Sequence, residues 1–435
     1  MLSRGRLLFI TVSLLTVALL VSGTMLASAQ QEKDESDSPY KYLAVFMEVF
    51  GLVGKAYVDE TEVEQLMDGA FEGVFDALDP FSVYVPAESI EAYRQSSTVG
   101  ASRSGLLVLK ERGVAYVMAV EDGSPGAEAG LEQGDILASL DGEETRTMPL
   151  FEVQERLAGD SGTVLQVEFL RQGSKETVEV ALADYDPPAV ELSAKEGVPV
   201  LRIPSFHEGV VSNVKKSLET IPQAAGAESA DAESVDAEAA SDETTIQVAA
   251  ANDNAPAEDG IALPAVEDTE KLLIDLRGVA GGDAESAYAV AGLFTGGELG
   301  ALRRREQDVE VFSGEDAASY EGRLAVLVDR STQGAAEILV TILRQQLEAA
   351  VIGEATFGHS GVLEEVELSS GGTLMITSAF FTGPDREPIA EKIEPDVWVR
   401  GRPGVDEEGV LVDSVLDRGV KFLLEEEEIE SKAAA

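Results

Sequence analysis

The sequence predicts a multidomain protein of mixed α+β and α/β class, with an N-terminal helical region, a β-rich domain and an α/β core. Three observations predict it. Apolar residues recur at helical spacing in residues 40–97, short β-branched runs fill residues 99–183, and strands alternate with helices from residue 271 onward. A chain of 435 residues with 44% hydrophobic content has material for about three such domains.

Composition excludes several classes of function. The chain has 81 Asp and Glu against 32 Lys and Arg, a net charge of −49. Nucleic acids and anionic lipid surfaces are therefore excluded as partners, because both require clustered basic residues. The absence of cysteine excludes a disulfide framework, a thiol nucleophile and cysteine-ligated zinc. With only two histidines, His207 and His359, no metal or other cofactor is predicted.

The N-terminus carries the pattern of an export signal. Arg4 and Arg6 precede an apolar run from Leu7 to Leu26, and small residues follow at Ala27–Ala29. This pattern predicts a cleaved signal peptide at residues 1–29, followed by a linker at 30–39. An uncleaved membrane anchor is the alternative, because the run is nearly long enough to span a bilayer. Either way we expect an exported protein, periplasmic or otherwise extracytoplasmic, which contacts a membrane only if the segment stays attached.

Residues 40–97 are predicted to be helical. Apolar residues at 43, 46, 50 and 53 form one stripe, and those at 63, 66, 67, 71, 74 and 78 form a second over residues 61–78. Pro80 follows shortly after and ends the second helix, because proline lacks an N–H donor and fixes φ.

Residues 98–184 are predicted to form a β-rich domain. Strands are expected at 106–109, 114–120, 136–140, 164–170 and 177–182, and short helices at 125–130 and 151–157. Gln172-Gly173 predicts a two-residue hairpin turn.

The α/β core is predicted at residues 185–222 and 271–405. Buried strands at 198–203, 271–277 and 324–329 alternate with helices near 284–294 and 335–349, and a later strand is expected at 373–380. Residues 223–270 interrupt this core with Ala, Asp, Glu and Ser and without any Lys or Arg. We interpret them as an acidic disordered insert, either a solvated linker or a docking tail for a basic partner. Residues 406–435 are predicted to form an amphipathic helix and an acidic tail.

Five sequence blocks, taken together, resemble those of a known protein family. They are Leu78–Tyr84, Asp122–Leu131 with Gly134–Leu137, Leu273–Arg277 with Gly281-Gly282, Gly353–Gly358, and Glu394–Val397. In this order they resemble the carboxyl-terminal processing, or tail-specific, proteases, from about Tyr40 to Val399. The resemblance implies a PDZ-like domain at 98–184 and a ClpP/crotonase-like catalytic-type core.

The same resemblance implies a Ser–Lys dyad, in which a neutral lysine activates a serine that attacks a peptide bond. The serine of the family stands three residues before a glutamate, and here Gly334 stands three residues before Glu337. The lysine follows Thr-Phe-Gly, and here that position is His359. A supporting glutamine falls on Leu363. All three positions depart from the family pattern, so the resemblance predicts a member without the dyad.

Other residues could carry the chemistry instead. Ser331 and Ser360 adjoin the two lost positions and are candidates for a displaced nucleophile. Neighbouring residues on a strand face opposite sides, which argues against a pair of His359 with Ser360. His207 is interpreted as a surface or packing residue at the end of a strand, and a metal held by His359 with carboxylates is not favoured.

Two binding features need only the backbone or an apolar groove. The resemblance implies an oxyanion hole formed by N–H groups near Gly282 and Ala335. A PDZ-like domain binds a C-terminus as an added strand, and backbone N–H groups hold its carboxylate. The residues expected to form this groove are Ser104, Gly105, Leu106, Leu107, Val108, Phe151, Val153 and Leu157. For Leu107 and Leu157 a place in the domain core is an equal alternative.

The sequence therefore predicts an exported pseudoprotease of the tail-specific family that binds protein or peptide C-termini. Regulation of an active relative, or of another envelope protein, is a related role. The alternative is an active serine endopeptidase with a displaced nucleophile and base. A third class, a structural envelope protein that binds cell-wall material, has no binding motif in its favour. The sequence does not indicate the oligomeric state.

Overall fold

The computed structural model describes residues 39–59, 62–75, 77–79, 81–91, 93–94, 103–111, 113–185, 189–207, 209–221, 244–247, 271–305, 307–314, 322–358, 360–369, 371–389, 391–401, 404–405 and 411–433. The chain divides into two compact units, residues 1–74 and 75–435. The predicted signal peptide, residues 1–29, lies outside the described residues. Among the helices of the described part, none is both long and apolar enough to cross a membrane.

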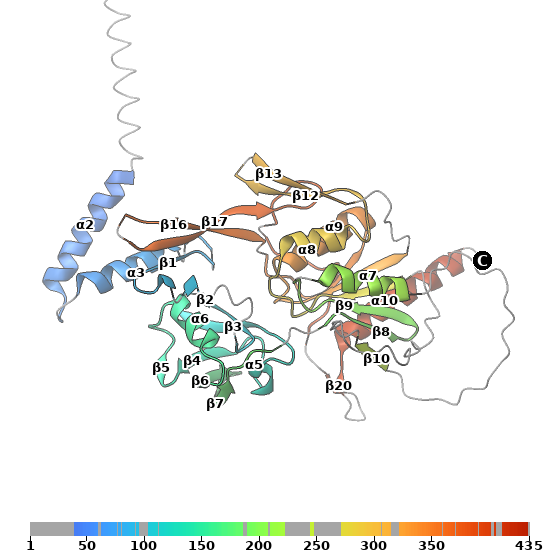
Figure 1. Ribbon diagram of the computed structural model, residues 1–435, viewed down its shortest axis with the longest axis horizontal. Coiled ribbons are helices and arrows are strands. Elements are labelled where there is room, and N and C mark those ends of the chain that lie inside the picture. Colours follow the sequence, from blue (N-terminus) through green and yellow to red (C-terminus); the bar gives the residue numbers. More distant parts are fainter. Residues whose placement is uncertain are drawn as a thin grey trace, which may run out of the picture. The chain divides into compact units, whose positions relative to one another are not determined.

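The first unit contains the two predicted helices, α2 (Pro39–Ala56) and α3 (Val63–Phe75), the second of which ends one residue beyond the unit (Figure 1). On α2 the side chains of Tyr42, Leu43 and Leu52 are more than half exposed. The apolar stripe of this helix is thus a surface feature rather than part of a core.

The β-rich domain is a sheet in the order β2-β3-β4-β6-β7. Its strands are β2 (Leu106–Glu111), β3 (Val114–Val120), β4 (Ile136–Leu140) with the short β5 (Glu143–Glu144), β6 (Val164–Arg171) and β7 (Ser174–Ala181). Two helices, α5 (Pro125–Glu128) and α6 (Leu150–Ala158), complete it. The predicted turn is confirmed, because Gln172 and Gly173 have φ of 51° and 86°. Strand β2 lies at the edge of this sheet.

The core is built on a sheet in the order β10-β8-β9-β11-β14-β15-β18, parallel from β9 to β18. Its strands are β8 (Glu191–Lys195), β9 (Val198–Arg202), β10 (Thr244–Gln247), β11 (Lys271–Asp275), β14 (Arg323–Val328), β15 (Ala350–Gly353) and β18 (Val397–Trp398). The helices are α7 (Val210–Thr220), α8 (Ala284–Ala291), α9 (Ala335–Leu347) and α10 (Ser414–Ala433). The predicted parallel α/β core is confirmed.

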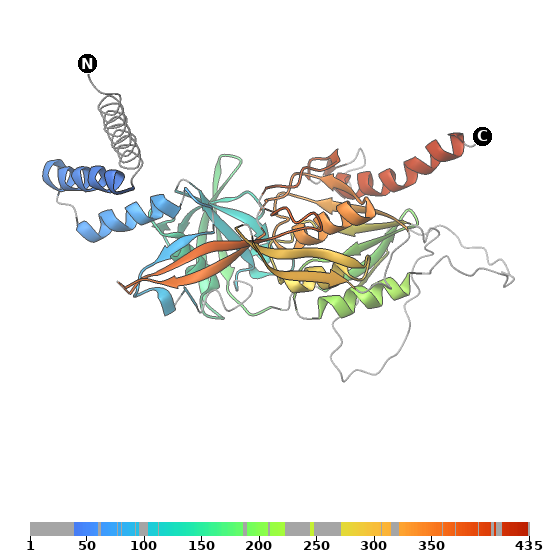
Figure 2. The same ribbon diagram turned by 90° about the horizontal axis from the view of Figure 1, so that it is seen from above.

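Side-chain alternation along the strands explains why helices cover both faces of this sheet. Leu272 and Ile274 join the apolar core formed with α7, α8 and α9. Leu273, between them, joins a second core with residues of α10. Figure 2 shows α7 and α10 on opposite sides of the sheet. Every residue of β11 is buried, as expected for a central parallel strand.

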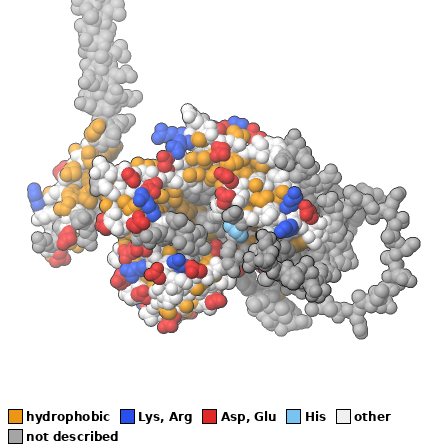
Figure 3. Space-filling view, in the orientation of Figure 1, with side chains coloured by type: hydrophobic (Ala, Val, Ile, Leu, Met, Phe, Trp, Pro, Cys, Tyr) orange, Lys and Arg blue, Asp and Glu red, His pale blue; other side chains and the backbone are white. Residues whose placement is uncertain are grey.

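A further sheet, separate from those of the β-rich domain and the parallel core, was not expected from the sequence. It has the order β1-β17-β12-β13, with β16 also paired to β17. Its strands are β1 (Val83–Val85), β12 (Gly297–Arg304), β13 (Gln307–Gly314), β16 (Gly361–Glu367) and β17 (Thr373–Phe381). Only β17 was predicted. The helical interpretation of residues 40–97 is wrong for β1, which pairs with β17. Figure 3 shows apolar side chains over β12 and β13, where Val309 and Val311 are exposed.

The interpretation of residues 223–270 as wholly disordered is also wrong at one place. Residues 244–247 form strand β10, which pairs antiparallel with β8. Their sequence, Thr-Thr-Ile-Gln, is uncharged and β-branched within an otherwise acidic stretch, which favours an edge strand. The other residues of this insert lie outside the described part of the chain. The predicted C-terminal helix is present as α10, but it begins only at Ser414 and continues through Glu425–Glu428, which were predicted to be an acidic tail outside the helix. It follows the pair β19 (Gly404–Val405) and β20 (Leu411–Val412).

Candidate functional site

The carboxyl ends of β9, β11 and β14 meet at one edge of the parallel sheet, and the loops after these strands carry Gly282, Ser331 and Gly334 of the predicted site. Residues 276–283 connect β11 to α8, and residues 329–334 connect β14 to α9. A β-bridge between Ala280 and Gln333 joins these two loops, and the N–H of Gln333 donates to the carbonyl of Val279 at 2.9 Å. In open parallel sheets this edge is where ligands bind.

Gly334 occupies the position at which the resemblance implies a nucleophilic serine. It immediately precedes α9 and has φ 60° and ψ −118°. A Cβ atom at this position would lie 3.3 Å from the Cα of Gly281. The position thus faces the glycine loop after β11, but glycine has no group that can attack a carbonyl.

Gly334→Ala is expected to lower the free energy of unfolding by about 2 kcal/mol, because a side chain is strained at this φ and ψ. Gly130→Ala is the matched control. Gly130 also has positive φ, 80°, but a Cβ there would meet nothing within 4 Å. We expect the control to cost about 1 kcal/mol. Urea unfolding of both variants checks the difference, and equal costs would mean that the contact with Gly281 adds nothing.

Glu337 connects the two halves of the predicted dyad site. Its side chain is fully buried at the start of α9. The carboxylate accepts hydrogen bonds from the N–H of Gly334 at 3.2 Å and from the N–H of Gly358 at 2.7 Å. The hydroxyls of Thr356 and Ser360 also donate to it. The segments on either side of position 359 are therefore held against position 334, although neither position carries the residue that the resemblance implies.

Both candidate displaced nucleophiles are buried and already donate hydrogen bonds. Ser331 is 1% exposed, and its hydroxyl donates to Asp329 Oδ1 at 2.8 Å. Ser360 is 2% exposed, and its hydroxyl donates to the carbonyl of Gly334 at 3.0 Å. A nucleophile must reach a substrate and pass its proton to a base. In the described arrangement neither serine is placed to do so.

Positions 359 and 363, where the resemblance implies a lysine and a glutamine, add little to the described site. His359 lies outside the described residues, so its side chain is not placed. Leu363 lies on β16, pairs with Thr377 of β17, and is 37% exposed. An aliphatic side chain at that position cannot replace the hydrogen bonds of a glutamine.

The glycine loop after β11 has the backbone form on which the predicted oxyanion hole depends. Gly281 and Gly282 have φ of 111° and 102°. A Cβ at Gly282 would lie 2.8 Å from the backbone oxygen of Phe206, so only glycine fits there. Gly281, rather than Gly282, faces Gly334. Ala335 is buried at the first position of α9. The oxyanion hole itself stays a prediction.

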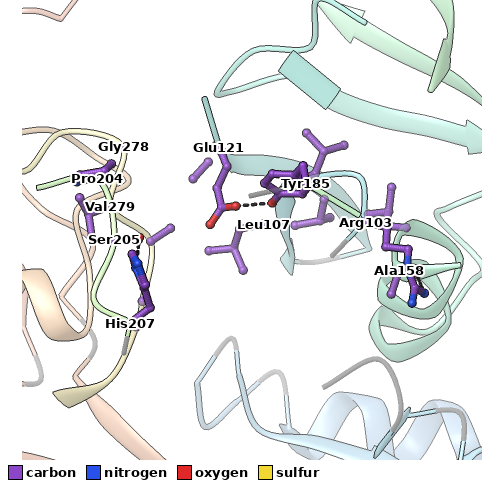
Figure 4. Close-up of a pocket in the computed structure, with 18 of the residues that line it drawn as sticks. Arg103, Leu107, Glu121, Ala158, Tyr185, Pro204, Ser205, His207, Gly278 and Val279 are labelled. Atoms are coloured by element: carbon purple, nitrogen blue, oxygen red, sulfur yellow. Dashed lines mark hydrogen bonds between the residues drawn. The ribbon is translucent and has the colours of Figure 1, made fainter. Parts of the chain in front are cut away.

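Five of the eight residues predicted for the peptide groove line a single cavity of about 770 Å³. They are Gly105, Leu106, Leu107, Val108 and Leu157, from β2, the residue before it, and α6. Leu107 is half-buried, whereas Leu157 is 1% exposed and belongs to the domain core as well. The cavity also extends to the loops after β9 and β11 of the core (Figure 4).

The other three predicted groove residues are buried and are not among those that line the cavity. Val153 is part of the domain core, and Phe151 is 6% exposed. Ser104 is fully buried, and its hydroxyl accepts a hydrogen bond from the N–H of Leu106 at 3.3 Å. Ser104 therefore stabilises the start of β2 through this hydrogen bond.

Two polar pairs in the cavity were not foreseen from the sequence. The Tyr185 hydroxyl donates to Glu121, and burial together with this hydrogen bond raises the pKa of the phenol above its ordinary range. Arg103 donates to Asp184 at 2.7 Å and to the carbonyl of Gly159 at 2.6 Å. Each pair joins residues distant in sequence, which is why no local pattern indicates it.

A third unforeseen pair lies on the core side of the cavity. Ser205 and His207 both line it, and Ser205 Oγ lies 2.7 Å from His207 Nδ1 (Figure 4). The sequence signal was present, since two residues in an extended segment at spacing i, i+2 share a side. Within the described residues, no group of three or more His, Asp or Glu side chains is placed to hold a metal ion.

Partly buried ion pairs fix the Asp-Leu-Arg segment at the end of β11. Arg277 donates to both oxygens of Asp275, at 2.9 and 2.7 Å, and to both oxygens of Asp413, at 2.8 Å each. Asp413 also accepts hydrogen bonds from the N–H groups of Val415 and Leu416 at the start of α10. Arg202 links Asp275 to Asp122 of the β-rich domain.

The Asp413 carboxyl is expected to make unfolding depend on pH. Burial by itself raises its pKa, but the Arg277 guanidinium and the N–H groups of Leu416 and Val415 outweigh burial and hold the pKa below its ordinary value. A lowered folded-state pKa stabilises the fold above the unfolded pKa of about 3.9, and this contribution is lost as the pH falls further. Urea unfolding between pH 5 and 3 should therefore show a shallower loss for Asp413→Asn, which keeps a capping oxygen. Parallel slopes for the two proteins would contradict this assignment.

Comparison with known proteins agrees with these features. The profile of peptidase family S41 matches residues 245–399, that of the PDZ domain matches 116–171, and that of the activating protease CtpB N-terminal domain matches 11–89. A carboxy-terminal-processing protease of Bartonella bacilliformis is 25% identical over 389 residues, covering 87% of this chain and 80% of that protein. A carboxyl-terminal-processing protease of Picosynechococcus sp. is 26% identical over 421 residues, covering 90% and 89%.

A solved structure shares the fold. The photosystem II D1 C-terminal processing protease is 19% identical, with a TM-score of 0.57, over 84% of this chain and 95% of that one. The chain thus contains an S41 peptidase segment and a PDZ segment, is similar in sequence to carboxy-terminal processing proteases over most of its length, and shares the fold of the D1 processing protease.

Proposed function

We propose that this protein is an exported member of the tail-specific protease family that has lost Ser–Lys peptidase chemistry and acts by binding protein C-termini. Candidate partners are the chain ends of envelope proteins, including an active relative. Export is proposed from residues 1–29 alone, and fractionation of cells that produce the full chain tests it.

The observation that carries the proposal is glycine at position 334 within an otherwise intact frame. The turn before α9, the glycine loop and the bonds from Glu337 to Gly334 and Gly358 are all present. Without a side chain at 334, this frame can hold a carbonyl group, but the protein cannot form an acyl-enzyme there.

The cavity beside β2 supports the binding half of the proposal. Strand β2 is an edge strand, and an edge strand can accept an added peptide strand. Leu106, Leu107 and Val108 bring apolar side chains to the cavity, together with Leu157 of α6. These features suit a peptide that ends in an apolar residue.

A cleavage assay tests the loss of peptidase chemistry. Purified residues 30–435 are incubated with an unfolded protein, and so is the variant Gly334→Ser/His359→Lys. We expect no cleavage by the wild type and cleavage by the double variant. If the wild type cleaves, and Ser331→Ala or Ser360→Ala abolishes the cleavage, the nucleophile has moved and the proposal fails.

A titration with labelled peptides tests the binding half. We expect a peptide with an apolar C-terminal residue to bind, and its amidated form to bind at least tenfold more weakly. Leu107→Asp should weaken binding by a similar factor, which corresponds to about 1.4 kcal/mol. Val164→Asp is the control, because Val164 is 55% exposed on β6 of the same domain and does not line the cavity. Equal binding of free and amidated peptides would exclude C-terminal recognition.

A further inference from the structure

We propose that Ser205 and His207 form a nucleophile–base pair that hydrolyses neutral carboxylic esters in the cavity beside β2. The pair is separate from positions 334 and 359, so this activity goes beyond the proposed binding function. It also differs from peptide-bond cleavage by a Ser–Lys dyad.

The distance between the two side chains suits a serine and its general base. Ser205 Oγ and His207 Nδ1 lie 2.7 Å apart, within the range seen for nucleophile and base. Both residues are half-buried and line the cavity, so the hydroxyl is accessible to a ligand there. By contrast, Ser331 and Ser360 are at most 2% exposed.

The segment that holds the pair is fixed against the glycine loop. The N–H of Asp283 donates to the carbonyl of Phe206, which lies between Ser205 and His207, at 2.8 Å. Gly282 packs directly on the backbone of the same phenylalanine. Glycine loops with positive φ present backbone N–H groups to an oxyanion, and Gly281 and Gly282 line the same cavity. The pair therefore lies beside a source of oxyanion donors.

The opposite wall of the cavity defines the substrate class. Leu106, Leu107 and Val108 provide an apolar surface for an acyl chain. Asp184 is paired with Arg103, whereas Glu121 faces Ser205 and His207, so its carboxylate disfavours a negative charge beside the Ser205 hydroxyl. Figure 4 shows Glu121 and Leu107 on the side of the cavity that faces Ser205 and His207. A neutral ester with an apolar acyl group fits both conditions.

The reaction needs no co-reactant except water. Ser205 Oγ forms a bond to the ester carbonyl carbon while its proton passes to Nδ1 of His207, which requires the tautomer protonated at Nε2. The C–O bond to the alcohol breaks, and the alcohol leaves with the proton. Water then attacks the acyl-serine, gives its proton to Nδ1, and releases the carboxylic acid with Ser205 restored. An ester suits this pair better than an amide, because an alkoxide is a better leaving group than an amine anion.

Labelling with an alkyl fluorophosphonate tests the pair directly. The probe forms a phosphorus–oxygen bond to an activated serine and loses fluoride. We expect one adduct on the wild type, mapped by peptide mass spectrometry to Ser205. His207→Gln should slow its formation by about 100-fold or more. Ser212→Ala is the matched control, since Ser212 is exposed on α7 and its hydroxyl already donates to a backbone carbonyl.

Hydrolysis of p-nitrophenyl butyrate provides a second readout. Ser205→Ala should abolish turnover, and thermal unfolding should show that this variant still folds. An unlabelled wild type, an adduct mapped to another serine, or labelling that His207→Gln leaves unchanged would each overturn the proposal. The cleavage assay repeated with Ser205→Ala keeps the two activities distinct, because we expect that substitution to leave cleavage by Gly334→Ser/His359→Lys intact.

Discussion

Glu337→Ala is expected to destabilise the protein by about 4 kcal/mol, the largest effect predicted for a single residue of the site. The carboxylate is fully buried and accepts hydrogen bonds from two backbone N–H groups and two hydroxyls. Its removal leaves the two N–H groups and the Thr356 hydroxyl without an acceptor in a region that excludes water, whereas the Ser360 hydroxyl keeps the carbonyl of Gly334. Each unsatisfied donor costs about 1–3 kcal/mol. Relief from burying the charge offsets part of that sum. Urea unfolding measures the loss.

Two further variants define the cause. Glu337→Gln should cost about half as much, because its amide keeps one acceptor oxygen and turns donor hydrogens toward a backbone N–H. Glu285→Ala, in the exposed first turn of α8, should change stability by less than about 0.5 kcal/mol. A loss below about 1 kcal/mol for Glu337→Ala would mean that the three orphaned donors find other partners. Glu337→Ala should also abolish any activity regained by Gly334→Ser/His359→Lys, since position 359 would no longer be held against position 334.

Arg277→Ala is expected to cost about 3 kcal/mol, because it leaves two carboxylates without their bidentate partner. Asp275 is 4% exposed and keeps the backbone N–H of residue 277, at 3.1 Å, and the longer contact to Arg202, at 3.5 Å. Asp413 loses both of its bonds to the guanidinium. Arg277→Lys should recover only part of the loss, because an ammonium group cannot bond both carboxylates in the same planar geometry.

Arg304→Ala is the control for this effect. Arg304 pairs with Glu364 at 2.8 Å, but its side chain is 53% exposed. Exposed ion pairs contribute about 0–1 kcal/mol. If both arginine variants unfold at the same urea concentration, the pairs at Arg277 behave like surface contacts and the network does not fix the end of β11.

The sequence predicted those elements whose pattern is local. Strands β11 and β14 each contain a continuous apolar run and are followed by helices, and that order indicates a parallel core. Strand β16 was missed because Gly361–Glu367 is rich in charge, and it becomes a strand through pairing with β17. Strand β13 was missed for a related reason, since Val309 and Val311 face solvent and give no apolar run.

The same distinction between local and long-range features applies to the candidate site. Gly334 and its neighbours could be located in the sequence through the family resemblance, because the turn before α9 is a local feature. The bonds from Glu337 to Gly358 and Ser360 could not be, since they span more than twenty residues. The sequence predicted His207 to be a surface or packing residue, because its i, i+2 spacing from Ser205 indicates only that the two side chains share a side. Only its hydrogen bond to Ser205, and a cavity lined from distant segments, give it chemical meaning.

Helix α10 affects how the core folds during synthesis of the chain. It follows every strand of the seven-stranded sheet in the sequence, yet Val415, Val420 and Leu423 close the second core over β9, β11 and β14. Gly419 allows close approach to that sheet, against Leu273 and Leu327. A chain made from its N-terminus can pair all of these strands while one apolar face is still bare. Until α10 is synthesised, such an intermediate would be a substrate for holdase chaperones and prone to self-association.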